Sequence, residues 1–244
     1  MIPLRDDNRG RHSQPYVTYA IIASNVLVYL YQARLPHDRL VAFITRWGAV
    51  PATITGGHDW WTLLTSLFLH ASWVHLGGNM LFLWIFGDNV EDVMGHISFG
   101  TFYVLVGLCA SAAQVWLGGP DSHVAIIGAS GAISGVLAAY MIFFPRGRVS
   151  TLVFLKFFVT VLMLPAWVMI GVWIALQILQ GFVSTTVQTA ESTSVAYLAH
   201  VGGFVGGLAL VWLFADRDRL ADQRIARQVI PEAIRWRSKE RSLG

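Results

Sequence analysis

The sequence predicts an all-α polytopic membrane protein, and three observations support this prediction. Hydrophobic residues make up 55% of the 244 residues and charged residues only 13%, whereas soluble domains average about 25% charged residues. Apolar runs without Asp, Glu, Lys or Arg recur along the chain, and about 20 such residues cross the core of a bilayer as a helix. The basic residues lie outside these runs. The sequence therefore predicts a bundle of membrane-spanning helices.

Six apolar runs predict six transmembrane helices. The second run is too long for one span, so residues 60–74 are expected to form a membrane-associated segment of a long first outer loop. The first run is long enough to span and lacks a small-residue cleavage site, so it does not fit a removable signal peptide. In chain order, the runs are residues 16–33, 60–87, 97–117, 122–145, 157–180 and 192–214.

The predicted spans divide the chain into three parts. Residues 1–15 are expected to be an N-terminal tail, residues 16–215 a transmembrane domain, and residues 216–244 a basic C-terminal tail. The C-terminal tail can form a helix on the membrane surface through Leu220 and Ile225. No internal repeat is visible in the sequence, which argues against a transporter built from inverted halves.

The charges of the loops predict the orientation of the spans. With six spans, both termini lie on one side, and of the 17 Lys and Arg residues only Arg34, Arg39 and Arg46 fall on the other side. Basic residues near span ends stay preferentially in the cytoplasm, so both termini are predicted to be cytoplasmic. The same rule explains the net charge of +3, and nucleic-acid binding is therefore not expected.

Few side chains capable of chemistry lie inside the predicted spans. Ser130 opens the fourth span, His200 lies in the sixth, and His75 and Asn79 lie in the second. These three spans run in the same direction, so depth can be counted from their inner ends at about 1.5 Å per residue. The count places Ser130, His200 and His75 about 20 to 22 Å from those ends, within a core about 30 Å thick. The three side chains are therefore expected at similar depth.

Pairs of glycines predict that the fourth and sixth spans come close together. Small residues four positions apart let two helix backbones approach, which would bring Ser130 within hydrogen-bond reach of His200. A neutral histidine can take the proton of a serine hydroxyl and so make it a nucleophile. The pairs are Gly131 with Gly135 and Gly203 with Gly207.

The stretch HASWVHLGGN, residues 70–79, contributes two polar groups to one helical face, because His75 and Asn79 are spaced i, i+4. Two neutral donors at the depth of a nucleophile suit an oxyanion hole, and the helix start at GASG adds free backbone N–H groups. Other readings stay open from the residues alone. A transmembrane serine often hydrogen-bonds its own helix, and His75 with Asn79 can bridge to another helix.

Together, HASWVHLGGN, GASG and AHVGG, in this order along the chain, resemble the rhomboid family of intramembrane serine proteases. The resemblance covers all six predicted spans. It implies that Ser130 is the nucleophile and His200 its general base, a dyad without an acidic third member. It also implies that His75, Asn79 and the backbone N–H of Ser130 stabilise the oxyanion.

The resemblance extends to supporting positions. It implies that Gly128 belongs to the nucleophile motif, that His70 supports the first loop, and that Glu91, within GDNVEDVMG, is structural. Two positions depart from the family pattern, since Thr62 stands where many members have arginine and Val195 where many have glycine. Both departures concern loop anchoring and local packing, and neither touches the dyad.

The resemblance implies an intramembrane serine endopeptidase that cleaves transmembrane-helix substrates in the outer part of the membrane, without a cofactor or metal. Its partners would be single-span membrane proteins and the lipid bilayer, and its location a bacterial inner membrane. Trp167 and Trp173 in the fifth span are expected to line a lateral entrance. The alternative is a non-catalytic rhomboid-like protein that binds client helices, whose signature would be the loss of Ser130 or His200, and both are present. The oligomeric state is left open.

Overall fold

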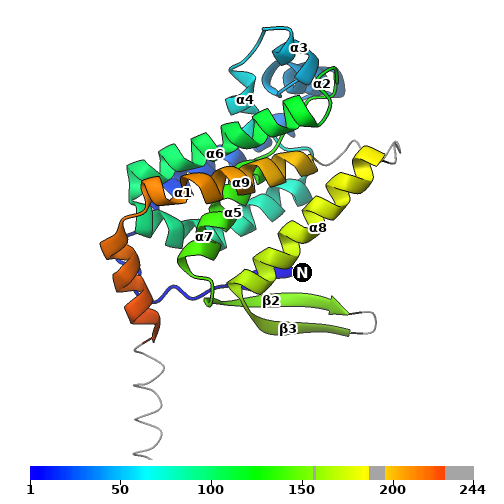
Figure 1. Cartoon of the computed structure of the whole chain (residues 1–244). Helices are drawn as coiled ribbons and strands as arrows, with labels where there is room; N and C mark the ends of the chain where they lie inside the picture. The colour runs from blue at the N-terminus through cyan, green and yellow to red at the C-terminus, as the bar shows by residue number, and fades with distance from the viewer. Residues whose placement is uncertain (156–157, 187–195, 229–244) are drawn as a thin grey trace, which may run out of the picture.

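The structure, a computed structural model, describes residues 1–155, 158–186 and 196–228, and this part of the chain is mainly helical (Figure 1). Shorter helices α2, α3 and α4 and the 3-10 helix η1 form the first loop. They comprise His37–Trp47, Pro51–Thr55, Thr62–Thr65 and Ser66–Phe68. The longer helices are α1 (Tyr16–Gln32), α5 (Trp73–Met94), α6 (His96–Leu117), α7 (Ser130–Phe143), α8 (Ala166–Thr186) and α9 (Tyr197–Phe214).

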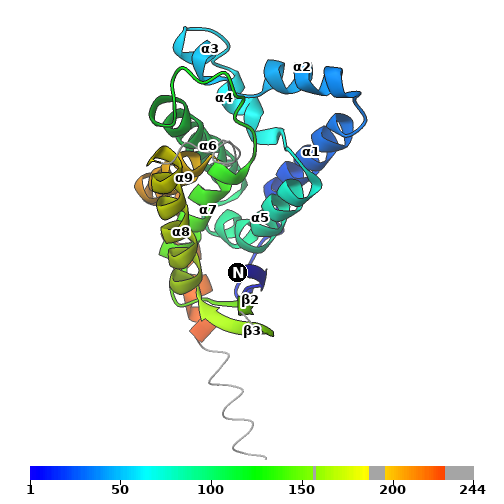
Figure 2. The ribbon, with the colours of Figure 1, turned by 90° about the vertical axis from the view of Figure 1, so that its right-hand side faces the viewer.

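Helix α7 lies at the centre of the bundle, with α5, α6, α8 and α9 packed around it (Figure 2). Its Val136, Leu137 and Tyr140 are completely buried. Small residues such as Gly131 and Gly135 on the same helix let its neighbours come near. The first residue of α7 is therefore held between several helices, which is where a precise site can be built.

Helix α5 differs from the predicted second span at both ends. It begins at Trp73, inside the segment 60–74 expected to belong to the loop, and Ser72 caps it by accepting a hydrogen bond from the backbone N–H of His75 at 3.1 Å. It continues past Gly87 to Met94, so that Asp88 and neighbouring acidic residues lie inside the helix. The helix extends this far because those acidic side chains find partners in the N-terminal segment.

The prediction of an all-α fold is wrong in one region, where the structure has a three-stranded antiparallel sheet of order β1-β2-β3. The strands are β1 (Ile2–Arg5), β2 (Arg148–Leu155) and β3 (Phe158–Pro165). The first part of the predicted fifth span is thus a strand, and α8 begins only at Ala166. The run FVTVLMLP misled the prediction because a short apolar run with β-branched residues fits a strand and a buried helix equally well. Pro165 also disfavours helix immediately before it.

The predicted fourth span, residues 122–145, is a helix only over Ser130–Phe143. Residues before it are held by the first loop, because Ile126 pairs with Ala49 in an antiparallel bridge and the N–H of Gly128 donates to the carbonyl of Ser66 at 2.9 Å. Gly128 has φ +128°, a conformation that side chains rarely adopt. The chain therefore turns into α7 only at Ser130.

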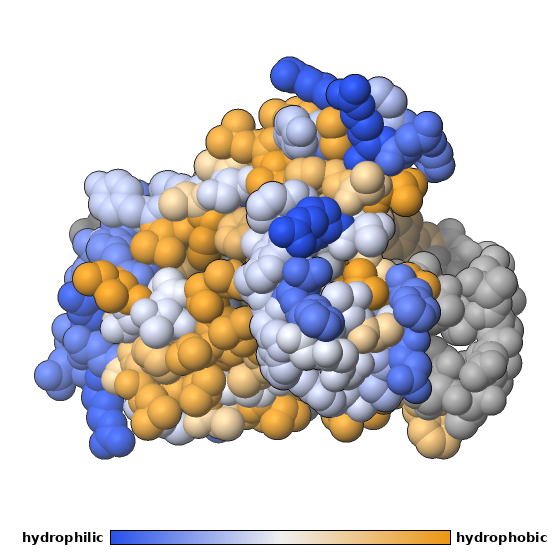
Figure 3. Space-filling view, turned by 90° about the horizontal axis from the view of Figure 1, so that it is seen from above, coloured by the Kyte–Doolittle hydropathy of each residue, from blue (hydrophilic) through white to orange (hydrophobic). Residues whose placement is uncertain are grey.

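Two helices in the described part of the chain, α6 and α9, are long and apolar enough to cross a bilayer. Helix α7 and residues Ala166–Gln180 of α8 are apolar but shorter. Many exposed side chains are large and apolar, among them Leu176, Leu179 and Leu213. Seen from above, apolar surface flanks patches of hydrophilic residues (Figure 3). An exterior of this kind suits lipid better than water.

The C-terminal segment, which the sequence predicts as a helix on the membrane surface, is held against the helix bundle. Residues 217–228 are helical and pack under α7, with Leu220 only 4% exposed. Arg224 donates to the backbone carbonyl oxygens of Phe143 and Ile142 at 2.9 and 3.1 Å. The last carbonyl groups of a helix lack hydrogen-bond partners within the helix, and Arg224 supplies the missing donors at the end of α7. Residues 229–244 of the predicted tail lie outside the described part.

Candidate active site

Ser130 and His200 face each other from two different helices. Ser130 is the first residue of α7, and His200 lies in the first turn of α9. Ser130 Oγ lies 2.7 Å from His200 Nε2, which is a hydrogen-bond distance for a hydroxyl and a ring nitrogen. His200 is only 8% exposed, whereas Ser130 is half-buried. The hydroxyl can therefore be reached from outside while the ring behind it is shielded.

Contacts between glycines allow the two helices to come this close. A Cβ atom at Gly203 of α9 would overlap the carbonyl oxygen of Gly131, and one at Gly207 would lie 2.6 Å from that of Gly135. Helices α7 and α9 thus pack backbone against backbone, as small residues at this spacing permit. Any side chain at these positions would push Ser130 and His200 apart.

The second ring nitrogen of His200 also has a partner, and this one comes from α8. His200 Nδ1 lies 2.6 Å from Oε1 of Gln177, and the indole of Trp173 lies beside the imidazole with ring centroids 5.7 Å apart. Trp173 and Gln177 are spaced i, i+4 and therefore share one face of α8. The ring of His200 is thus held on both edges and on one face.

The His75 ring packs directly against Gly128. A Cβ atom at Gly128 would lie 2.9 Å from Nε2 of His75 and 3.7 Å from Oγ of Ser130. Glycine is thus needed at this position for its positive φ and for the space that the imidazole fills. The space beside the α-carbon of Gly128 is bounded by the hydroxyl of Ser130 on one side and an N–H-bearing ring on the other.

Asn79 lies one turn further along α5 and contacts His70 rather than Ser130. Its Nδ2 lies 2.9 Å from His70 Nε2, and an amide N–H only donates, so His70 Nε2 accepts. The backbone of His70 is in turn held by Gln32, which accepts from its N–H at 3.2 Å and donates to its carbonyl at 3.3 Å. The buried His70 therefore links the end of α1, the first loop and Asn79. Among the described residues, the second N–H of the Asn79 amide has no acceptor.

The first loop is anchored without the arginine that the family pattern has at position 62. Thr62 is buried and its hydroxyl donates to the carbonyl oxygen of Asp59 at 2.7 Å. Arg46 of α2 lies over the ring of Trp61, 4.7 Å from its centroid, and contacts Asp59 at 3.2 Å. An arginine from another helix thus holds the tryptophan in this chain. Val195, the other departure, lies outside the described residues.

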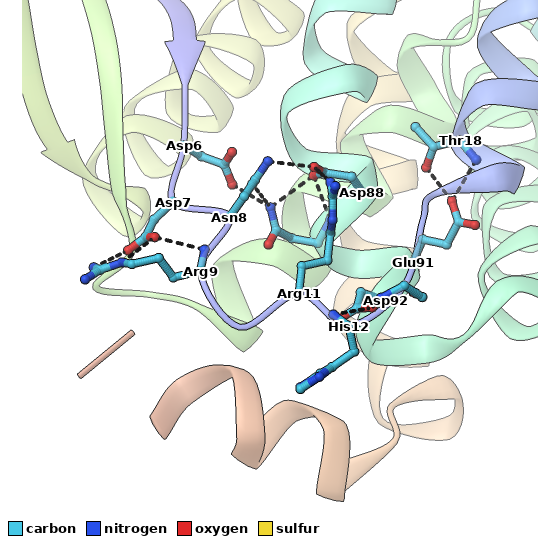
Figure 4. Close-up of polar contacts among 12 residues, drawn as sticks. Asp6, Asp7, Asn8, Arg9, Arg11, His12, Thr18, Asp88, Glu91 and Asp92 are labelled. Carbon is cyan, nitrogen blue, oxygen red and sulfur yellow. Dashed lines mark hydrogen bonds and ion pairs between the residues drawn. The ribbon is translucent and has the colours of Figure 1, made fainter. Parts of the chain in front are cut away.

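A second polar cluster lies at the other end of α5, where acidic side chains point toward the N-terminal segment (Figure 4). Glu91 accepts hydrogen bonds from the backbone N–H groups of Val17 and Thr18 at 2.9 and 2.7 Å. It also lies 2.6 Å from Nδ1 of His96, a histidine for which the sequence indicates no partner. Pro15 cannot cap α1 with its side chain, so the Glu91 carboxylate takes that place at the positive end of the helix.

The rest of this cluster ties the N-terminal segment to α5 and α7. Asp92 accepts from the N–H of Ser13 at 2.7 Å, and Asp88 accepts from Arg11 at 2.6 Å. Asp6 accepts from the hydroxyl of Tyr140 at 2.9 Å. We call this group the charged cluster. Its members are Asp6, Asn8, Arg11, Asp88, Asn89, Glu91, Asp92 and Arg227.

Gln177 is the residue of this site that the sequence reading overlooked. It stands in an apolar helix of 21 residues, where a polar side chain is itself a signal because it needs a partner. It belongs to none of the motifs, and Gln180 on the same helix is also a glutamine, so the sequence does not single Gln177 out. Its partner, His200, is 23 positions away and meets it only through the packing of α8 on α9.

Comparison with known proteins adds an independent finding. The sequence model of the Rhomboid domain matches residues 57–217 of the chain. Rhomboid-like protein 11, chloroplastic, of Arabidopsis thaliana is 32% identical over 160 residues, which cover 64% of this chain and 53% of the relative. Rhomboid protein 1, mitochondrial, of Saccharomyces cerevisiae is 28% identical over 173 residues (67% and 44%). Rhomboid protease AarA of Providencia stuartii is 30% identical over 144 residues (52% and 50%). The chain spans about half the length of these curated relatives.

Proposed function

The chain belongs to the rhomboid family of membrane proteins, and from this premise we propose that it is an intramembrane serine endopeptidase. The observation that carries the proposal is the 2.7 Å contact between Ser130 Oγ and His200 Nε2. A hydroxyl hydrogen-bonded to a histidine is the pair that acyl transfer to serine requires. One of the relatives above is itself named a rhomboid protease.

We propose that α1, α5, α6, α7, α8 and α9 are the six spans and that both termini are cytoplasmic, in a bacterial inner membrane. Helix α7 has only 14 residues, too few for the full core thickness. Because the chain reaches Ser130 through non-helical backbone, the nucleophile would lie below the outer surface in a recess. Non-helical backbone at such depth is tolerated where it lines a water-filled cavity.

In the proposed reaction, Ser130 Oγ attacks the carbonyl carbon of a substrate peptide bond while its proton moves to His200 Nε2. The tetrahedral intermediate carries a negative oxygen, which the Ser130 backbone N–H, His75 and Asn79 would stabilise. His200 then gives its proton to the leaving amine, which releases one fragment and leaves an acyl-serine ester. Water, deprotonated by His200, hydrolyses that ester and restores the hydroxyl.

The proposed substrates are single-span membrane proteins that reach the site sideways from the bilayer. Helix α8 would form one wall of this entrance, since Trp167 is 57% exposed and Trp173 contacts both Phe82 of α5 and His200. A substrate helix must unwind locally there, because its backbone groups are otherwise paired within the helix.

Replacement of Ser130 by alanine tests the proposal. The variant should lose detectable cleavage of a single-span substrate in liposomes, and it should lose labelling by a fluorophosphonate. The matched control is Ser24→Ala on α1, a serine whose hydroxyl donates to its own helix at Ala20 and which should cleave as the wild type does. If the wild type binds substrate helices but neither cleaves nor labels, the chain is instead a non-catalytic client-binding protein.

A further inference from the structure

We propose that Gln177 is a positioning residue for catalysis, which holds His200 in the tautomer and orientation that a general base for Ser130 requires. The inference rests on the proposed function and adds a third member, from a third helix, to the dyad. The geometry is a chain of two hydrogen bonds, with Ser130 Oγ at 2.7 Å from His200 Nε2 and His200 Nδ1 at 2.6 Å from Gln177 Oε1.

The chemistry of the amide decides the tautomer. Oε1 of Gln177 is a carbonyl oxygen and only accepts, so the Nδ1 atom of His200 must carry the hydrogen in this contact. A neutral imidazole has one N–H, which leaves Nε2 with a free lone pair directed at the Ser130 hydroxyl. Nε2 is thus the atom that can take the serine proton. The opposite tautomer would place an N–H against the hydroxyl and could not act as the base.

Because His200 is buried, loss of its hydrogen bond to Gln177 should have a larger effect than it would in water. His200 is only 8% exposed, so solvent offers little replacement for a lost acceptor at Nδ1. When the ring takes the serine proton it becomes a cation, and hydrogen bonds to charged groups are stronger than neutral ones. A carboxylate would bind that cation more tightly but is costly to place in a membrane span. A neutral amide supplies the acceptor without that cost.

The same hydrogen bond has a purely structural reading, in which it fastens α8 to α9. Interhelical hydrogen bonds in membranes contribute modestly to stability. That role predicts a change in stability without any effect on the protonation of the base. The two roles therefore differ in the pH dependence of the rate and in the position of the ring proton, and these are the measurements that separate them.

The first test measures kcat and KM against pH for Gln177→Leu and Gln177→Glu in liposomes. Loss of the acceptor in Gln177→Leu should lower kcat about 10- to 100-fold with KM little changed. Gln177→Glu keeps an acceptor oxygen, so it should retain more activity, and the acidic limb of its profile should move to higher pH because a carboxylate favours the protonated ring. The control Gln180→Leu removes an exposed amide from the same helix and should match the wild type.

The proposal is overturned if Gln177→Leu keeps kcat within twofold of the wild type, or if the leucine and glutamate variants lose activity equally with unshifted pH limbs. Such a result leaves the Ser130 mechanism standing as long as Ser130→Ala is inactive. If the wild type itself does not cleave, the position of the hydrogen on the His200 ring still tests the proposal. In protein with ¹⁵N-labelled histidine, His200, assigned by its absence in His200→Ala, should carry hydrogen on Nδ1, and hydrogen on Nε2 would refute the proposal.

Discussion

Helix α5 joins two polar clusters of opposite character. Near its start, His75 and Asn79 lie by a site whose other side chains are serine, histidine and glutamine. Near its end, Asp88, Glu91 and Asp92 belong to the charged cluster, which contains both carboxylates and guanidinium groups. The two clusters lie on one helix, so the contrast between them reflects their surroundings and their tasks.

The contrast indicates that permanent charge and transient charge need different environments. In the proposed reaction the site must stabilise a negative oxygen that exists only briefly, and neutral donors aimed at that oxygen do so without charge in the resting protein. The charged cluster instead holds fixed partners together, because its carboxylates accept from backbone N–H groups of the N-terminal segment and from Arg11. Changes at His75 and Asn79 should therefore alter the rate of cleavage, and changes in the charged cluster should alter the stability of the fold.

The largest effect on kcat is expected from a charge placed at Asn79, beside the proposed active site. Asn79→Ala removes one proposed oxyanion donor and should lower kcat about 100- to 1,000-fold, with KM nearly unchanged. Asn79→Asp should be worse than alanine because its carboxylate would repel the oxyanion and contact His70. The measurement is cleavage of a reconstituted single-span substrate. Similar kcat values for Asn79→Asp and the wild type would show that Asn79 does not face the oxyanion.

In the charged cluster the expected effect is on stability. Glu91→Gln replaces an oxygen acceptor by an amide N–H₂ group opposite the N–H groups of Val17 and Thr18. It should lower the free energy of unfolding by about 1–3 kcal/mol, while kcat of the folded fraction stays within about twofold. Denaturant unfolding and cleavage assays on one preparation separate the two quantities. Asp121→Asn, at an exposed loop position, is the control and should change neither.

How far sequence reasoning reaches differs between the two clusters. Depth counting and glycine spacing predicted that Ser130 and His200 approach each other, and the structure has them 2.7 Å apart. Such reasoning works there because the predicted spans have a common direction and contain few polar residues that could pair. It cannot work for Ser13 and Asp92, which meet across 79 positions. Short irregular segments carry no periodicity, so the sequence predicts only a tail for residues 1–15.

The strand Phe158–Pro165 and Gln177 were missed for related reasons. Hydropathy alone does not separate a short strand from the start of a helix, and only pairing with Arg148–Leu155 decides it. A glutamine in an apolar helix shows that a partner is needed but does not identify that partner. In both cases the deciding contact is made with another element, the preceding strand β2 for Phe158–Pro165 and helix α9 for Gln177.

The smallest expected effect is a change of stability with pH. Measuring it tests whether every member of the charged cluster stabilises the fold at neutral pH. Burial, and then the nearby Asp88, raise the pKa of Asp6 from 3.8 to about 7, against the opposing hydrogen bond from Tyr140 and the charge of Arg227. Between about pH 4 and pH 7 the folded chain keeps the Asp6 proton and the unfolded chain releases it. The folded state then binds more protons, so stability should fall as pH rises through this range.

Asp6→Asn should remove this slope, and thermal unfolding from pH 5 to pH 7.5 measures it. Asp7 gives the matched control, since its hydrogen bonds with Arg9 keep the pKa of its carboxyl below the ordinary value despite partial burial. Asp7 is therefore ionised in both states across that range, and Asp7→Asn should leave the slope unchanged. A slope that survives in Asp6→Asn would place the titrating group elsewhere in the protein. If the slope disappears, one member of the charged cluster weakens the fold near neutral pH, whereas Glu91 strengthens it.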